Sequence, residues 1–273
     1  MIVFLSILKV LFVITLIYFA ALYFSQERII FYPEKIEPEY TFRFKNKFEE
    51  KWLQVQDSKV HSLYFEAPNA PGIILYFHGN GGALDTWGEL ASDYVDQTGW
   101  SIWIVDYPGY GKSSGKITSE AQLHEMAAIM YDEAKKFAPN QKVVLYGRSL
   151  GSGLATRLAS EKTVDGVVLE TPYFNIRDLA YFYYPYVPSF ILRYKFSSNE
   201  WVKNIKSPIL FIHGTDDRII PYAEGKKLFD MTPGPKEFFT IEGGQHNALP
   251  TYSEYWKTLK RFLDQLSGKS NTH

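Results

Sequence analysis

The stretch Gly147-Arg148-Ser149-Leu150-Gly151 decides the fold of this chain. It follows the apolar run 142–146 and precedes a segment, 152–160, whose composition predicts a helix. A sharp Gly-x-Ser-x-Gly turn between a strand and a helix strains the backbone of its serine and exposes the hydroxyl above the end of a sheet. The glycines are needed because neighbouring backbone passes where a Cβ would clash. Ser149 is therefore the candidate nucleophile, and it requires a base, an acid and an oxyanion site elsewhere in the chain.

The apolar runs of the chain alternate with helical stretches. Continuous runs, which predict strands buried on both faces of a sheet, cover 72–77, 101–105, 142–146, 166–169, 208–212 and 237–241. Half-exposed runs, which predict an antiparallel start, cover 52–55 and 61–65. Helices are expected at 84–97, 119–137, 152–160, 222–231 and 252–266. This alternation predicts an α/β fold with a mostly parallel central sheet and helices on both faces.

The composition excludes several function classes. The chain has 273 residues, 46% of them hydrophobic and 22% charged, so it is globular rather than disordered. Its net charge of -1 gives no excess of positive charge with which to bind nucleic acid. It contains no cysteine, which excludes disulfides, thiolate catalysis and cysteine-based zinc sites.

The first segment differs from the rest of the chain. Ile2 to Phe24 is apolar except for Ser6, Lys9 and Thr15, and a helix of this length crosses roughly 30 Å of hydrocarbon. A cleaved secretory signal is the rival interpretation, but the positive n-region is poor and no small-x-small cleavage site follows. We therefore expect an uncleaved single-pass membrane anchor. Arg28, Lys35 and Arg43 follow the apolar segment, against only Lys9 and the amino terminus on the other side. This charge difference favours a cytoplasmic domain only weakly, because large domains can cross the membrane despite such charges, so the side on which the domain lies stays open.

Three regions follow from these patterns. Residues 1–25 are expected to form the transmembrane anchor, 26–50 a polar and aromatic connector, and 51–268 the catalytic domain. Within that domain, 173–207 is too long for an ordinary connection and is rich in Tyr, Phe and Trp. It is either a helical excursion packed on the body or a small cap over the active site. We favour the cap, because so many aromatic side chains in an insertion need a surface or ligand to cover.

A serine nucleophile needs a histidine base, and the histidine needs a carboxylate that fixes its tautomer. His246 lies in the turn Gly243-Gly244-Gln245-His246 after the last expected strand, and it is the candidate base. The candidate acid is Asp217, in the loop after strand 208–212; Asp216 and Glu170 are the alternatives. Both loops follow strands, and open α/β sheets place their sites at the carboxyl ends of strands. His213 is expected to brace its own loop.

The oxyanion of a tetrahedral intermediate needs two donors. One is the backbone N–H of Leu150, directly after the nucleophile. The loop His78-Gly79-Asn80-Gly81-Gly82 should supply the other, and we assign it to the backbone N–H of Asn80, with Gly79 as the alternative. A phosphate-binding loop is the rival interpretation. The loop lacks both the Lys-Ser/Thr ending of a P-loop and the Gly-x-Gly-x-x-Gly spacing of a dinucleotide fold.

Five motifs in order make the chain resemble the α/β-hydrolase superfamily, and within it the small membrane-anchored serine hydrolases. They are residues 76–82, 106–113, 147–152, 213–217 and 243–247. The resemblance implies Ser149, Asp217 and His246 as a catalytic triad, and a reaction on carboxylic esters, thioesters or peptides with no cofactor and no metal. Tyr107-Pro108 departs from the family pattern, in which many relatives carry an arginine, and this change bears on the rim of the pocket.

The leading prediction is thus a serine hydrolase that cleaves carboxylic esters or thioesters of hydrophobic acyl substrates through an acyl-enzyme. The expected partners are a small acyl ester or lipid-like substrate and a membrane held by the N-terminal helix, and not nucleic acid. A serine peptidase of the same fold is the alternative. A non-catalytic scaffold of this fold is disfavoured, because such proteins usually lose a triad residue and this chain keeps all three.

Overall fold

The computed structural model describes residues 1–268 of the chain. Its eight strands are β1 Phe48–Val55, β2 Ser58–Phe65, β3 Gly72–Phe77, β4 Ser101–Val105, β5 Lys142–Arg148, β6 Gly166–Glu170, β7 Ile209–Gly214 and β8 Lys236–Ile241. The α-helices are α1 Ile2–Ile30, α2 Leu84–Thr98, α3 Glu120–Phe137, α4 Leu150–Glu161, α5 Ile176–Tyr183, α6 Ser198–Trp201, α7 Tyr222–Met231 and α8 Ser253–Ser267. Short 3₁₀ turns are η1 Ser189–Ile191, η2 Val202–Asn204 and η3 Leu249–Thr251. Every strand and helix expected from the sequence is present.

The strands form one sheet in the order β1-β2-β4-β3-β5-β6-β7-β8. The pairs β1–β2 and β2–β4 are antiparallel, and all the other pairs are parallel. The chain therefore starts antiparallel and continues parallel, as the sequence predicts. The strand order reverses around β3, which lies between β4 and β5. The loops after β3 and β5 consequently emerge side by side, at the kind of switch point where ligands bind in open α/β sheets.

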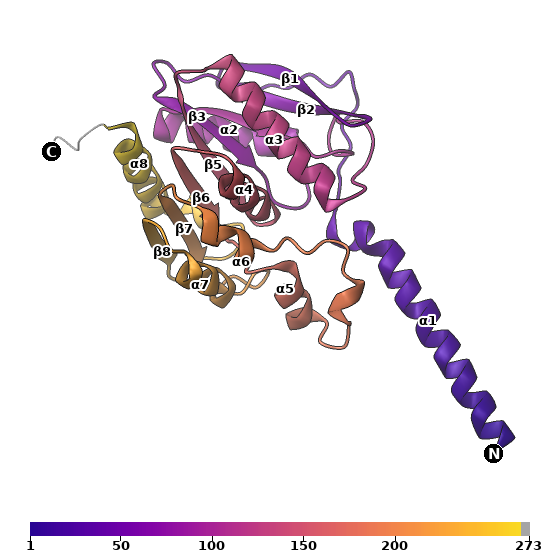
Figure 1. Cartoon of the computed structure of the whole chain (residues 1–273). Helices are drawn as coiled ribbons and strands as arrows, with labels where there is room; N and C mark the ends of the chain where they lie inside the picture. Colours follow the sequence, from indigo (N-terminus) through magenta and orange to yellow (C-terminus); the bar gives the residue numbers. More distant parts are fainter. Residues whose placement is uncertain (269–273) are drawn as a thin grey trace.

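Helices cover both faces of the sheet (Figure 1). Along β3, alternate side chains enter opposite cores: Ile73 and Leu75 lie in one, Ile74 and Tyr76 in the other. The first core is closed by side chains of α3, α4 and α7, and the second by side chains of α2 and α8. Burial on both faces explains why the central strands are continuous apolar runs rather than alternating ones.

Helix α1 projects away from the body, with its N-terminus far from the sheet (Figure 1). The helix continues to Ile30, beyond the expected start of the connector at Gln26, and ends before Pro33. Its most apolar window has a mean hydropathy of 2.6, and within residues 1–268 no other helix is long and apolar enough to cross a membrane. A membrane anchor and a signal sequence both satisfy this criterion.

The aromatic insertion between β6 and β7 contains α5, η1, α6 and η2. Its aromatic side chains divide into two sets. Tyr173, Tyr194 and Phe196 are buried in the core beneath it. The other set is exposed and comprises Tyr181, Phe182, Tyr183, Tyr184, Tyr186 and Phe190. The insertion therefore packs on the body through one set and faces outward with the other.

Candidate active site

The turn that contains Ser149 has the geometry of a strained elbow. Ser149 separates β5 from α4 and has a φ of 52° and a ψ of -117°, in a region that residues with a side chain rarely occupy. Its backbone N–H donates to the carbonyl of Glu170 at 2.9 Å, and its own carbonyl accepts from the Ser152 N–H at 2.9 Å. A Cβ on Gly151 would overlap the carbonyl oxygen of Phe77. The glycine thus allows α4 to begin directly against the end of β3.

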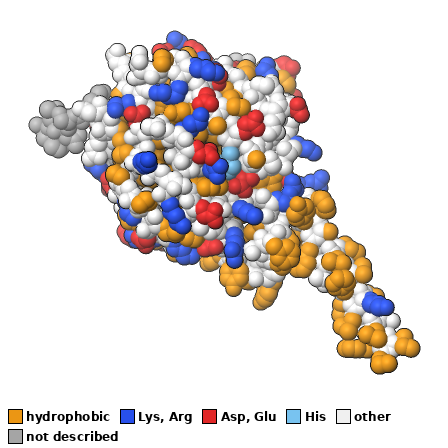
Figure 2. Space-filling model, viewed as in Figure 1, with side chains coloured by type: hydrophobic (Ala, Val, Ile, Leu, Met, Phe, Trp, Pro, Cys, Tyr) orange, Lys and Arg blue, Asp and Glu red, His pale blue; other side chains and the backbone are white. Residues whose placement is uncertain are grey.

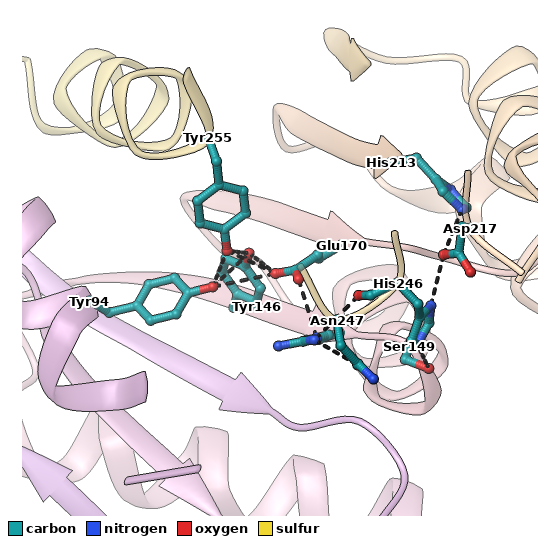
Figure 3. A network of polar contacts seen from close by, with 10 residues as sticks. Tyr94, Tyr146, Ser149, Glu170, His213, Asp217, His246, Asn247 and Tyr255 are labelled. Atoms are coloured by element: carbon teal, nitrogen blue, oxygen red, sulfur yellow. Dashed lines mark hydrogen bonds and ion pairs between the residues drawn. The ribbon is translucent and has the colours of Figure 1, made fainter. Parts of the chain in front are cut away.

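The three candidate triad residues are in hydrogen-bond contact (Figure 3). His246 Nε2 lies 3.0 Å from Ser149 Oγ, and His246 Nδ1 lies 2.7 Å from Asp217 Oδ2. All three residues are less than 9% exposed. Since Nδ1–H donates to the carboxylate, Nε2 is left to accept the proton of the serine hydroxyl. The arrangement can transfer a proton from Ser149 to His246 while Asp217 stabilises the resulting imidazolium.

Asp217 is held as a charged carboxylate. Its Oδ1 accepts the backbone N–H groups of Ile219 and Ile220, each at 2.8 Å, and His213 Nε2 lies 3.3 Å from Oδ2. Burial alone would raise the pKa of Asp217, but hydrogen bonds from His213 and His246 outweigh it and hold the pKa well below its usual range. His213 Nε2 also donates to the Ile220 carbonyl, 2.9 Å away, so His213 braces its loop as expected.

The alternative acids lie elsewhere. The side chain of Asp216 is exposed, and its backbone N–H donates to the Gly244 carbonyl at 3.0 Å. Glu170 is fully buried and faces Arg148, with an Oε1–Nε distance of 3.2 Å. Of the three carboxylates considered from the sequence, Asp217 is the one in contact with His246.

The loop after β3 runs beside the candidate nucleophile. The position of a Cβ on Gly79 would lie 3.5 Å from the Ser149 Cβ, so the backbone of residues 79–80 borders the space above the serine. Leu150 is the first residue of α4, where backbone N–H groups have no acceptor within the helix. The two expected oxyanion donors, the N–H groups of Asn80 and Leu150, therefore belong to two segments that both border Ser149. His78 is buried between Asp106, at 3.5 Å, and the Gly79 carbonyl, at 2.7 Å, and anchors the loop.

The side chain of Asn80 ties this loop to the end of α1. Its Nδ2 donates to the Ile30 carbonyl. Its Oδ1 accepts from the Tyr32 N–H at 3.1 Å, the Tyr110 hydroxyl at 3.0 Å and the Gly81 N–H at 3.0 Å. The loop that borders the serine is consequently fixed by the chain that leaves α1, a role of Asn80 that the sequence did not reveal.

A second interaction missed at the sequence level joins the elbow to the histidine loop. Arg148 Nη2 donates to the Asn247 side-chain oxygen at 3.0 Å and to the His246 carbonyl at 3.3 Å. On its other side, Arg148 pairs with Glu170. Burial alone would lower the pKa of Arg148, but the nearby Glu170 and the surrounding tyrosines outweigh it and raise the pKa, so the guanidinium stays charged.

Three tyrosine hydroxyls surround the other oxygen of Glu170 (Figure 3). Oε2 accepts from Tyr146 at 2.5 Å and Tyr255 at 2.8 Å, with Tyr94 at 3.4 Å. This network holds a charged pair inside the second core, where an unpaired charge would be costly. The sequence does hint at this network, because Arg148 directly precedes Ser149 in the Gly-x-Ser-x-Gly turn and Asn247 directly follows His246. A long charged side chain at the buried end of a strand needs a partner.

The comparisons with known proteins agree with this architecture. Residues 72–199 match the family described as alpha/beta hydrolase fold. Alpha/beta hydrolase domain-containing protein 17B of Homo sapiens is 30% identical over 203 residues, which cover 73% of this chain and 68% of that protein. An esterase of Pyrococcus furiosus superposes with a TM-score of 0.68 at 18% identity, over 87% of this chain and 100% of that chain. Est1E of Butyrivibrio proteoclasticus, with ferulic acid bound, gives 0.65 at 17% identity, over 80% and 100%.

Proposed function

Because this chain belongs to the α/β-hydrolase family, we propose that it is a serine hydrolase that cleaves carboxylic esters or thioesters of hydrophobic acyl groups. The observation that carries the proposal is the continuous contact from Ser149 Oγ through His246 to Asp217, at the strained turn. A surface serine has no such base and no reason to adopt a positive φ.

In the acylation step, His246 Nε2 takes the proton of the Ser149 hydroxyl as its oxygen attacks the carbonyl carbon of the ester. The negative charge that develops on the carbonyl oxygen is stabilised by the backbone N–H groups of Leu150 and Asn80. His246 then gives the proton to the leaving alcohol or thiol, and the acyl group stays on Ser149. In deacylation, His246 deprotonates a water molecule, which attacks the acyl-enzyme. The acid leaves, and Ser149 recovers its proton.

Contacts at the end of α1 support an uncleaved anchor. Gln26 is buried, and its side chain donates to the Ile191 carbonyl at 2.8 Å and accepts from the Arg193 N–H at 2.8 Å. Asn80 holds Ile30 and Tyr32 in turn. Cleavage after the apolar run would cut the chain next to these contacts, so we propose that α1 remains as a single-pass membrane anchor. Mass spectrometry of the N-terminus of the membrane-extracted protein tests this.

Labelling with a fluorophosphonate probe tests the nucleophile. The full-length protein in detergent should be labelled, and Ser149→Ala and His246→Ala should abolish labelling. The matched control is Ser160→Ala, on the same helix, whose side chain bonds only the Arg157 carbonyl within the described residues. Labelling of a folded Ser149→Ala protein would refute the assignment of Ser149.

A series of p-nitrophenyl esters with increasing acyl length tests the substrate class. We expect kcat/KM to rise from acetyl to at least octanoyl, because the anchor places the domain next to lipid. A preference for acetyl would argue against hydrophobic acyl groups. Faster hydrolysis of aminoacyl p-nitroanilides than of any ester would establish the peptidase instead.

A further inference from the structure

The exposed aromatic side chains of the insertion form one outward surface. Tyr186 is 92% exposed and Phe190 82%, while Tyr181, Phe182 and Tyr184 are each more than 60% exposed. Figure 2 shows hydrophobic side chains gathered over α5 and η1, on the part of the body next to the root of α1. We call Tyr181, Phe182, Tyr184, Tyr186 and Phe190 the aromatic face. No described residue covers this face, although large apolar patches on soluble proteins usually mark a binding surface.

The insertion is joined firmly to α1. Besides the two hydrogen bonds of Gln26, Glu27 pairs with Arg193 at 2.6 Å and accepts from the Tyr194 hydroxyl at 2.9 Å. The Arg193 guanidinium lies 5.4 Å from the centre of the Tyr23 ring. Side chains of the last two turns of α1 therefore bond directly to residues 191–194, at the end of η1 and just after it. The position of the aromatic face relative to the anchor is fixed by these contacts rather than left to a flexible linker.

The length of α1 sets the level of the membrane surface. As a helix, Ile2 to Phe24 measures about 34 Å at about 1.5 Å per residue, slightly more than the roughly 30 Å of hydrocarbon. The membrane boundary then falls near Tyr23, with the exposed Arg28 beyond it among the headgroups. Tyr23 is in contact with Arg193, which follows η1 by two residues, and η1 contains Phe190. The aromatic face consequently starts at the level of the lipid headgroups.

We propose that the aromatic face docks on the surface of the same bilayer that α1 spans. Tyrosine suits this place because its amphipathic ring is stabilised between water and hydrocarbon, and phenylalanine suits it because its apolar ring is buried at the boundary with the acyl chains. The body of the protein would then rest on the membrane, and the insertion would hold the Ser149 site close to lipid. The inference rests on the proposed anchoring role of α1, and it does not depend on the proposed hydrolase activity.

Site-specific fluorescence tests the docking. The chain contains no cysteine, so Tyr186→Cys and Phe190→Cys can each carry a single environment-sensitive fluorophore. Lys136→Cys is the matched control, since Lys136 is an exposed residue in the last turn of α3, away from α1. The full-length proteins are reconstituted in phosphatidylcholine vesicles, with and without a lipid that carries a nitroxide quencher near its headgroup.

We expect the labels at 186 and 190 to shift to shorter emission wavelength and to lose fluorescence with the quencher lipid, and the label at 136 to do neither. Equal behaviour of the three labels in vesicles that float with the protein would overturn the docking and leave the anchor intact. Failure of the protein to float would overturn both. Disulfide cross-linking of two Tyr186→Cys chains, without quenching by lipid, would identify a second copy as the occupant and refute the bilayer.

A functional comparison separates docking from catalysis. The double variant Tyr186→Ser/Phe190→Ser should hydrolyse a long-chain ester dissolved in vesicles about tenfold more slowly, because bilayer contact scales with buried apolar area. Its fluorophosphonate labelling and its hydrolysis of a short soluble ester should match the parent protein. If the fluorophosphonate did not label the parent protein, the proposed hydrolase activity would be refuted and the docking would not. Equal rates on the vesicle-bound ester would contradict a role of the face in presenting lipid.

Discussion

Arg148 donates a hydrogen bond of 3.0 Å to the side-chain oxygen of Asn247. The residue before the candidate nucleophile thereby holds the residue after the candidate base, across a sequence separation of 99 positions. The same guanidinium is paired with the buried Glu170. Arg148 thus sets the distance between the elbow and the histidine loop, and we regard it as a positioning residue that acts through His246.

Arg148→Met should lower kcat by about 10- to 100-fold, because small displacements of reacting groups cost this much. It should also destabilise the fold by about 3–5 kcal/mol, since it leaves Glu170 as an unpaired buried charge. The double variant Arg148→Met/Glu170→Gln removes that charge and should recover most of the stability without recovering kcat. Steady-state kinetics with a short soluble ester and urea denaturation measure the two effects. Recovery of kcat together with stability would reduce Arg148 to a purely structural role.

The side chain of Asn80 allows a second, finer test. Asn80→Asp keeps an oxygen that accepts from Tyr32, Tyr110 and Gly81, but replaces the donor to the Ile30 carbonyl by a second acceptor. Asn80→Ala removes all four bonds and keeps the backbone N–H. We expect kcat to fall about tenfold in Asn80→Asp and by up to about 100-fold in Asn80→Ala, with KM nearly constant, because a displaced oxyanion donor acts on the transition state.

Tyr110→Phe is the control for Asn80. It removes the hydroxyl that donates to Asn80 Oδ1 and accepts from the Tyr32 N–H, and it leaves every residue of the loop after β3 unchanged. Its kcat should fall by less than that of Asn80→Asp. Equal kcat in the parent and Asn80→Ala proteins would show that the hydrogen bonds that join the Asn80 side chain to Ile30 and Tyr32, at the end of α1 and just after it, have no part in the reaction.

The sequence predicted the mostly parallel sheet with helices on both faces, all eight strands, and the loops that carry the site. Each of these features depends on local patterns in the sequence. A buried parallel strand needs a continuous apolar run, and the elbow needs glycine on both sides of its serine. Ser149, His246 and Asp217 were selected on the same basis, and the structure brings them into contact.

The interactions missed at the sequence level are long-range pairs of polar side chains. The hydrogen bonds from Gln26 to the Ile191 carbonyl and from Asn80 to the Ile30 carbonyl form only once the chain has folded. A polar residue at the end of an apolar helix resembles a surface residue, so nothing local marks Gln26 as buried. The aromatic insertion was similarly ambiguous, because composition does not show which aromatic rings face the core.

His61 predicts a pH dependence of stability. The residue is fully buried, 2.8 Å from Glu50, with its ring stacked on Phe42. Burial lowers the pKa of His61 from 6.5 to about 4, against the attraction of Glu50 and with a smaller lowering effect of Lys112. The unfolded chain therefore binds more protons between these two values. This contribution is complete above the unfolded pKa and is lost as the pH falls toward 4.

Between about pH 7.5 and about pH 5 this loss should amount to about 2 kcal/mol in the free energy of unfolding. Urea denaturation in detergent, followed by tryptophan fluorescence, measures it. In His61→Gln the decrease over the same range should be smaller by that amount, because no imidazole remains to be protonated. Parallel curves for the two proteins would mean that His61 does not contribute to the pH dependence.

The elbow itself gives the sharpest structural prediction. A Cβ in Gly151→Ala would overlap the Phe77 carbonyl and lie 2.8 Å from the His78 carbonyl, so α4 would have to move away from the end of β3. Overpacking of this kind costs about 1–3 kcal/mol or more, and it displaces Ser149 from the loop after β3. We expect a lower melting temperature and loss of fluorophosphonate labelling. In the control Gly234→Ala the nearest atom to the new Cβ is 3.4 Å away, and stability should change by less than about 0.5 kcal/mol. A Gly151→Ala protein with unchanged labelling would contradict the close approach of α4 to β3 on which the site depends.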